Sequence, residues 1–169
     1  MADTNRILDD AKGQLFDELD RIRAGMLGVD GTGQHMQPMT AYSDRDTGDL
    51  WFISSKETDL VRTLSPGATA HFTFTGKDHD YYACVRGTME MSNDKAKLDE
   101  LWSPIAAAWF EDGREDDNVC LLRFSIEDAS VWATSGNPVR FAFQIAKANM
   151  TEETADLGEH RVLNWKTAA

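Results

Sequence analysis

The stretch Leu50–Leu64, LWFISSKETDLVRTL, decides the fold, and the rest of the chain can be organised around it. Its first part, Leu50–Ser54, is predicted to be a strand, because large apolar and aromatic side chains favour extended backbone. Its second part, Glu57–Leu64, has the apolar spacing of a short helix, which Ser65-Pro66-Gly67 would end. A strand that turns directly into a short helix is typical of sheet proteins with helical inserts.

Upstream of this stretch, the sequence predicts a helix over about residues 5–26 and then a strand over 34–42. The helix is indicated by apolar residues at spacings of three and four, namely Leu8, Ala11, Leu15, Leu19, Ile22 and Met26. Asp3 or Thr4 would cap its start. The segment 43–49, SDRDTGD, is rich in Asp and predicts the turn of a hairpin that returns through Leu50–Ser54.

Downstream, short strands alternate with short helices. Helices are predicted from Ser92 or Asn93 to Trp102, from Pro104 to Phe110, and over 138–149. Strands are predicted over 68–75, 81–91 with a bulge or a close backbone approach at Gly87, 119–132 as a strand pair or one bent strand, and 158–165 as an edge strand. No repeat or linker divides the chain. We therefore expect one domain over residues 1–169, mainly β with helical inserts (α+β), built as a small antiparallel barrel.

The composition indicates an ordinary globular protein, with 41% hydrophobic and 27% charged residues in a chain of 169. A formal net charge of −12 repels nucleic-acid phosphates and anionic membranes. No apolar run approaches the ~20 residues that span a bilayer, and the acidic N-terminus is unlike a signal peptide. We expect no nucleic-acid or membrane partner and a cytoplasmic location. Cys84 and Cys120 lie in apolar strands and are expected to be buried, reduced thiols.

Several classes of active site find no support in the sequence. His35, His71, His79 and His160 are scattered without the spacing of metal ligands, so no metal is expected. The chain has no G-x-S-x-G, P-loop or G-x-G-x-x-G motif, which leaves hydrolase and Rossmann interpretations unsupported. The acidic run over 111–117 lacks EF-hand spacing and is interpreted as a solvated loop.

Two features have the chemistry to hold an anionic, aromatic ligand. Ser54, Ser55 and the backbone N–H groups at the start of the 57–64 helix form a possible anion cradle, with Lys56 and Arg62 close by in sequence. An ordinary capping turn is the alternative. The stretch before the acidic run carries three aromatic residues that belong either to the core or to a cofactor platform: Trp102, Trp109 and Phe110.

Taken in order, these features resemble the general stress protein 26 family, within the pyridoxamine 5'-phosphate oxidase-like FMN-binding split barrels. The resemblance runs from about Leu15 to His160. Its pieces are Pro38-Met39, Leu50-Trp51-Phe52, Val85–Gly87, Asp94 with Trp102, Trp109-Phe110 through Gly113 to Asp116-Asp117, Trp132 and Gly158-Glu159-His160. It implies a six-stranded antiparallel split β-barrel. It also implies a homodimer with two flavin sites, for FMN or FAD, in the grooves between subunits.

The resemblance also implies cofactor-binding residues. Those implied to line the isoalloxazine ring are Met36, Gln37, Pro38 and Met39, with Trp51 and Phe52 beside them. Those implied to surround the ribityl phosphate are Ser54, Ser55, Lys56 and Thr58, with Arg62 close by. Those implied to approach from the partner subunit are Trp109 and Phe110. No catalytic residue is indicated, because any redox chemistry would belong to the flavin.

Two positions depart from the family pattern. Gln37 stands where the family usually has Arg, and Leu60 stands where it usually has Lys. Each charge-assisted hydrogen bond to a phosphate contributes about 1.5–3 kcal/mol, so losing two weakens binding by a few powers of ten. Either Lys56 and Arg62 compensate, or the chain binds FMN weakly, takes another flavin such as FAD, or has lost the cofactor. A non-catalytic, stress-associated dimeric binding protein is therefore the alternative to a flavin-dependent oxidoreductase, and pyridoxamine-phosphate oxidase activity itself is not expected.

Overall fold

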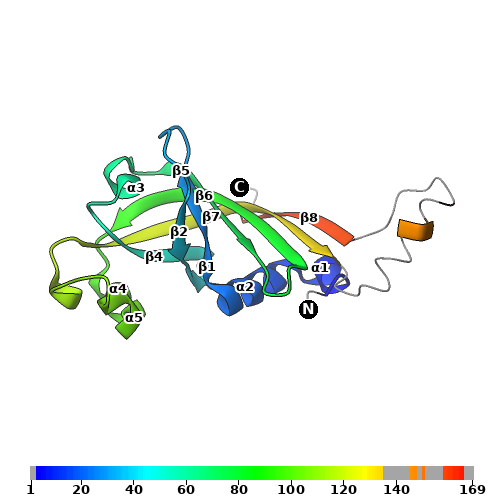
Figure 1. The fold of residues 1–169 in the computed structure, drawn as a ribbon, viewed down its shortest axis with the longest axis horizontal. Helices are drawn as coiled ribbons and strands as arrows, with labels where there is room; N and C mark the ends of the chain where they lie inside the picture. The colour runs from blue at the N-terminus through cyan, green and yellow to red at the C-terminus, as the bar shows by residue number, and fades with distance from the viewer. Residues whose placement is uncertain (1–2, 135–144, 148–149, 151–157, 166–169) are drawn as a thin grey trace.

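The computed structural model describes residues 3–134, 145–147, 150 and 158–165. Within these ranges, a single antiparallel sheet of eight strands dominates the fold (Figure 1). The strands are β1 (Ala24–Val29), β2 (Gln37–Thr40), β3 (Tyr42–Asp44), β4 (Asp49–Ser55), β5 (Ala68–Thr75), β6 (Tyr81–Ser92), β7 (Val119–Thr134) and β8 (Gly158–Asn164).

The sheet curls into a split barrel. Its strand order is β2-β1-β5-β6-β7-β4-β3, with β8 paired to β7 beyond the end of β4. Only Ala41 separates β2 from β3, although these strands lie at opposite ends of the order. The two edges of the sheet must therefore meet at Ala41, and β2 does contact β4. The predicted antiparallel split barrel with helical inserts is confirmed, with eight strands in the described sheet where the resemblance implied six.

Short helices cover the barrel ends and connect the strands. They are α1 (Arg6–Asp9), α2 (Ala11–Ile22), α3 (Asp59–Arg62), α4 (Lys95–Leu101) and α5 (Pro104–Ala107), followed by the 3₁₀ turn η1 (Gly113–Glu115). Figure 1 places α2 beside β1, and α4 and α5 together at the opposite end of the long strands from α1. The core contains residues of α2 and of the strands, with Phe52, Phe72 and Phe124 packed ring against ring.

The predicted helix over 5–26 is wrong in its extent. Asp10 interrupts it with a non-helical backbone, and its carboxylate then accepts a hydrogen bond from the Gly13 N–H to cap α2. Arg23, with φ of 59°, ends α2, and the chain continues as β1. Met26 matches the helical spacing, yet it lies in a strand paired with both β2 and β5. Sheet pairing overrides the local period here.

Other predicted elements are confirmed with adjusted bounds. The predicted strand over 34–42 shortens to β2, and β3 begins at Tyr42 and takes in Ser43 and Asp44 of the predicted turn. The predicted helices at 57–64, 92–102 and 104–110 shorten to α3, α4 and α5. Asp94, not Ser92 or Asn93, caps α4, accepting from the Lys97 N–H at 2.9 Å. The 119–132 segment is one strand, β7. The predicted helix over 138–149 falls outside the described residues except for 145–147, which are helical.

Candidate functional site

The fold brings two of the sequence-predicted segments side by side. β2 carries Gln37–Met39, β4 carries Trp51–Ser55, and the two strands are in contact. The far edge of β2 has no partner strand in the described sheet, because β2 ends the strand order. Unpaired backbone N–H and C=O groups on a strand edge can pair with an amide-like ligand edge. This is the chemistry that the pyrimidine edge of a flavin presents.

Trp51 and Phe52 lie on opposite faces of β4, as neighbouring residues of a strand must. Phe52 is fully buried against Phe72 and Phe124, so it supports the site only from beneath. Trp51 is buried, and Lys97 and Arg123 each lie 5.8 Å from the centroid of its ring. Its indole N–H has no hydrogen-bond partner among the described residues. A buried donor without a partner can take an acceptor from a ligand or a water.

Arg123 and Lys97 are residues that the sequence reasoning did not select. Arg123 donates twice to the buried carboxylate of Asp49, at 2.8 and 3.0 Å, and Ser125 donates to the same carboxylate. The hydrogen bond to Asp49 raises the pKa of Arg123 above its ordinary value. Lys97 pairs with Glu100 at 2.9 Å. The sequence carried no local signal for Arg123, because only the pairing of β4 with β7 aligns it with Trp51.

The turn between β4 and α3 satisfies its own hydrogen bonds. Thr58 caps α3, with its hydroxyl accepting from the Val61 N–H at 3.3 Å and donating to the Ser55 carbonyl at 2.9 Å. The Ser55 hydroxyl accepts from the Glu57 N–H at 3.2 Å. Leu60 is only 3% exposed and belongs to the core. The capping-turn alternative therefore describes this segment.

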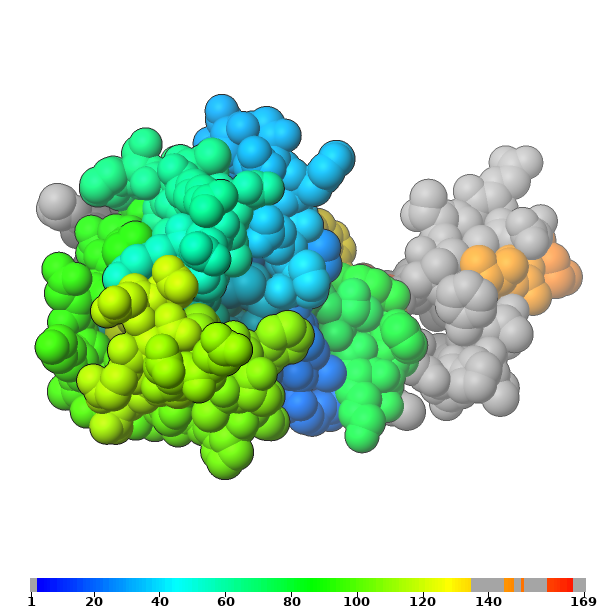
Figure 2. All heavy atoms as spheres, turned by 60° about the vertical axis from the view of Figure 1, so that its left-hand side comes forward, coloured from blue at the N-terminus to red at the C-terminus, as the bar shows by residue number. Residues whose placement is uncertain are grey.

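The acidic loop faces this turn directly. The Lys56 ammonium donates to the Asp117 carbonyl at 2.6 Å, and the Lys56 N–H donates to the Asn118 carbonyl at 2.8 Å. Figure 2 shows the 104–118 segment, in yellow-green, against the cyan 50–60 segment. None of the ion pairs among the described residues involves Arg62. Lys56, the cation nearest the turn in sequence, is thus already engaged.

The two aromatic residues expected from a partner subunit have different surroundings. Trp109 is 82% exposed just beyond α5, and Ile105 within α5 is exposed as well. Phe110 packs on Trp102 with ring centroids 5.9 Å apart. Trp109 therefore has the freedom to contact another molecule, whereas Phe110 anchors the segment to α4.

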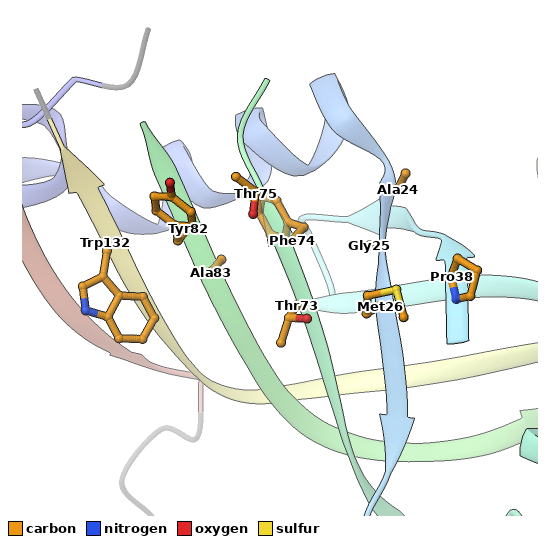
Figure 3. Close-up of a pocket in the computed structure, with 10 residues that line it drawn as sticks. All are labelled: Ala24, Gly25, Met26, Pro38, Thr73, Phe74, Thr75, Tyr82, Ala83 and Trp132. Carbon is orange, nitrogen blue, oxygen red and sulfur yellow. The ribbon is translucent and has the colours of Figure 1, made fainter. Parts of the chain in front are cut away.

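A shallow groove of about 470 Å³ opens on the outer face of the sheet (Figure 3). Pro38 is the sequence-predicted residue that lines it, with Met26, Thr73, Tyr82 and Trp132 among the other walls. The strand register extends this surface across six strands as a row: Pro38, Met26, Thr73, Cys84, Ser130 and Val162. Tyr82, Trp132 and His160 form a parallel row, and the His160 ring stacks on Trp132 at 4.8 Å.

The cysteines are free thiols, and their environments agree only in part with the prediction. Cys120 is buried, and burial raises its pKa to about 11. Cys84 is half-buried in the outer-face row, and desolvation raises its pKa as well. High pKa values keep both as thiols at neutral pH. In the described ranges no cluster of three or more His, Cys, Asp or Glu residues could hold a metal ion, and no helix is long and apolar enough to cross a membrane.

Judged against a flavin, the residues fit one part of the ligand and not another. The open edge of β2 and the unpartnered indole N–H of Trp51 suit a planar heterocycle with donor and acceptor groups. The β4–α3 turn suits a phosphate poorly, because the Thr58 hydroxyl, the Glu57 and Lys56 N–H groups and the Lys56 ammonium already donate to partners within the protein.

The fold and this site define a pyridoxamine 5'-phosphate oxidase-like split barrel. The family model described as "Pyridoxamine 5'-phosphate oxidase like" matches residues 10–156, and the chain belongs to that family. Among its relatives, general stress protein 26 of Bacillus subtilis strain 168 is 30% identical over 124 residues, which cover 70% of this chain and 86% of the relative. The chain is thus of the general stress protein 26 type.

Solved structures agree with this assignment. A crystal structure described as a general stress protein 26 from Jannaschia sp. CCS1 is 38% identical, with a TM-score of 0.76, covering 93% of this chain and 99% of that one. The general stress FMN/FAD binding protein from Xanthomonas citri is 35% identical, with a TM-score of 0.68, covering 74% of this chain and 89% of that one.

Proposed function

We propose that this protein binds a flavin, FMN or FAD, as a homodimer. The observation that carries the proposal is the 35% identity to a protein named for FMN/FAD binding, over 89% of that protein's length. The contact between β2 and β4 supports it, since it assembles the segments that the family resemblance assigns to the cofactor. When bound, the flavin would supply electron or hydride transfer, while the protein orients it and sets the polarity around it.

In this proposal the ring lies along the open edge of β2, beside Gln37–Met39 and the Trp51 side of β4. The ribityl chain runs towards Ser54, Ser55 and Thr58. We assign no catalytic residue. An oxidoreductase role would rest on the flavin and on a separate electron donor.

The homodimer is proposed from the outer face of the sheet. Met26, Tyr82 and Trp132 are each about two-fifths exposed there, and Val162 is 59% exposed. Contiguous exposed apolar surface of this kind marks interaction sites in soluble proteins. A second copy seated on this face would cover the groove of Figure 3. We further propose a cytoplasmic location, where free thiols such as Cys84 and Cys120 persist.

The experiment is a visible absorption spectrum of the freshly purified protein, followed by fluorescence titration with FMN and FAD. A flavin spectrum, or saturable quenching, is the expected result. A colourless protein that quenches neither flavin would refute flavin binding and leave the non-catalytic binding protein, which the engaged turn at Ser55–Thr58 favours.

A further inference from the structure

Many of the positively charged side chains in the described part of the chain already have a partner within the protein. Among the described residues, seven arginines and one lysine form ion pairs with carboxylates at 4.0 Å or less, namely Arg6, Arg21, Arg45, Arg86, Arg114, Arg123, Arg161 and Lys97. Lys56 is held by the Asp117 carbonyl, and Lys12 lies over the Trp165 ring. The composition explains this pairing, because the chain has 29 acidic residues and only 17 basic ones.

Besides Lys12 and Lys56, four further cations form no ion pair among the described residues, and they lie on separate elements. Arg23 lies between α2 and β1, Arg62 ends α3, Lys77 lies in the β5–β6 turn and Lys95 begins α4. A phosphate monoester carries nearly two negative charges at neutral pH. Such a group is held by two or more converging cations or by several free N–H donors. No single element of the described protomer brings two of these four cations together.

The surroundings of the β4–α3 turn work against an anion. Five carboxylates and one arginine occupy the facing loop at 111–117. Glu57 and Asp59 add two more carboxylates within the turn itself, opposite Lys56 and Arg62. Leu60 is in the core, so its position offers no charge. A phosphate over this turn would meet a field of its own sign.

We propose that this protein recognises a flavin through its ring and ribityl chain and leaves the phosphate in solvent. The ligand class is then the flavins as a whole, with riboflavin bound about as tightly as FMN. The inference rests on the proposed function, since it concerns the same site. It adds a claim about the phosphate, and this claim can be wrong even where the protein does bind a flavin.

The test compares riboflavin, FMN and FAD by fluorescence titration of the flavin-free full chain, at low and at high salt. Dissociation constants within about threefold of one another, unchanged by salt, are expected. FMN binding more than about threefold tighter than riboflavin would overturn the inference and leave flavin binding intact. Failure of all three flavins to bind would overturn flavin binding itself, and the inference with it.

A charge reversal at the turn provides a second test. Glu57 is exposed, so Glu57→Lys should fold, and it would place a second cation beside Lys56. We expect this variant to prefer FMN over riboflavin by at least about tenfold. Asp9→Lys makes the same change of charge on α1, at the other end of the molecule from α3 in Figure 1, and should not alter the ratio. If Glu57→Lys left the ratio of the FMN and riboflavin dissociation constants unchanged, the phosphate would not lie over this turn.

Discussion

Gly87 is the position where the structure makes its sharpest prediction about stability. The β6–β7 ladder shifts register between Arg86 and Gly87, forming the predicted bulge. A Cβ atom on Gly87 would lie 2.2 Å from the Ser125 carbonyl oxygen and 2.7 Å from a ring carbon of Phe124. Backbone cannot yield as a flexible side chain can, so Gly87→Ala must push β6 away from β7.

Overpacking of this kind costs about 1–3 kcal/mol, and each weakened ladder hydrogen bond adds about 0.5–1.5 kcal/mol. We expect Gly87→Ala to lower the free energy of unfolding by about 3 kcal/mol. For a chain of this size, that lowers Tm by about 6–12 °C. The bulge also bends the two longest strands of the described sheet, so the variant should weaken flavin binding indirectly.

Gly67→Ala is the matched control. Gly67 has a φ of 73°, and a Cβ atom added there would have no neighbour within 4 Å, so its substitution introduces only backbone strain, about 1 kcal/mol. Urea unfolding of both variants, followed by tryptophan fluorescence, measures the difference. If the two variants lost the same free energy, the close approach of Gly87 to β7 would not be limiting, and this reasoning would be refuted.

Three further predictions concern charge, thiol reactivity and assembly. Desolvation raises the pKa of the buried Glu18 carboxyl. Its contribution to stability is therefore complete below the unfolded-state pKa and is lost as pH rises through the folded-state pKa. Glu18→Gln should flatten the dependence of Tm on pH between acid and neutral pH in thermal unfolding scans. Cys120, with a pKa of about 11, should resist a thiol reagent at pH ~8 until the protein unfolds, and rapid reaction of the native protein would contradict its burial. Trp132→Asp should convert the proposed dimer to a monomer in light scattering at micromolar concentration, whereas Leu8→Asp, on the exposed surface of α1, should not. A monomeric wild-type protein would refute the proposed dimer.

The strands were predictable where one face of the sheet is buried. In β5 and β6 the buried residues alternate with the more exposed ones, so the sequence carries the period directly. β1 was missed because Ala24–Val29 is short, contains two glycines and continues the apolar spacing of α2. Only its pairing with β2 and β5 makes it a strand, and that information is not local.

The candidate site was predictable as a set of segments but not as a geometry. Trp51 and Phe52 are neighbours in sequence, yet the strand places one beneath Lys97 and the other in the core. Lys56 was expected to be available for a phosphate, but its ammonium reaches the Asp117 carbonyl, far along the chain. Whether a cation is free depends on every carboxylate and carbonyl that the fold brings within reach. In a chain with a net charge of −12, that competition favours internal partners, which is why we expect selection for the uncharged part of the flavin.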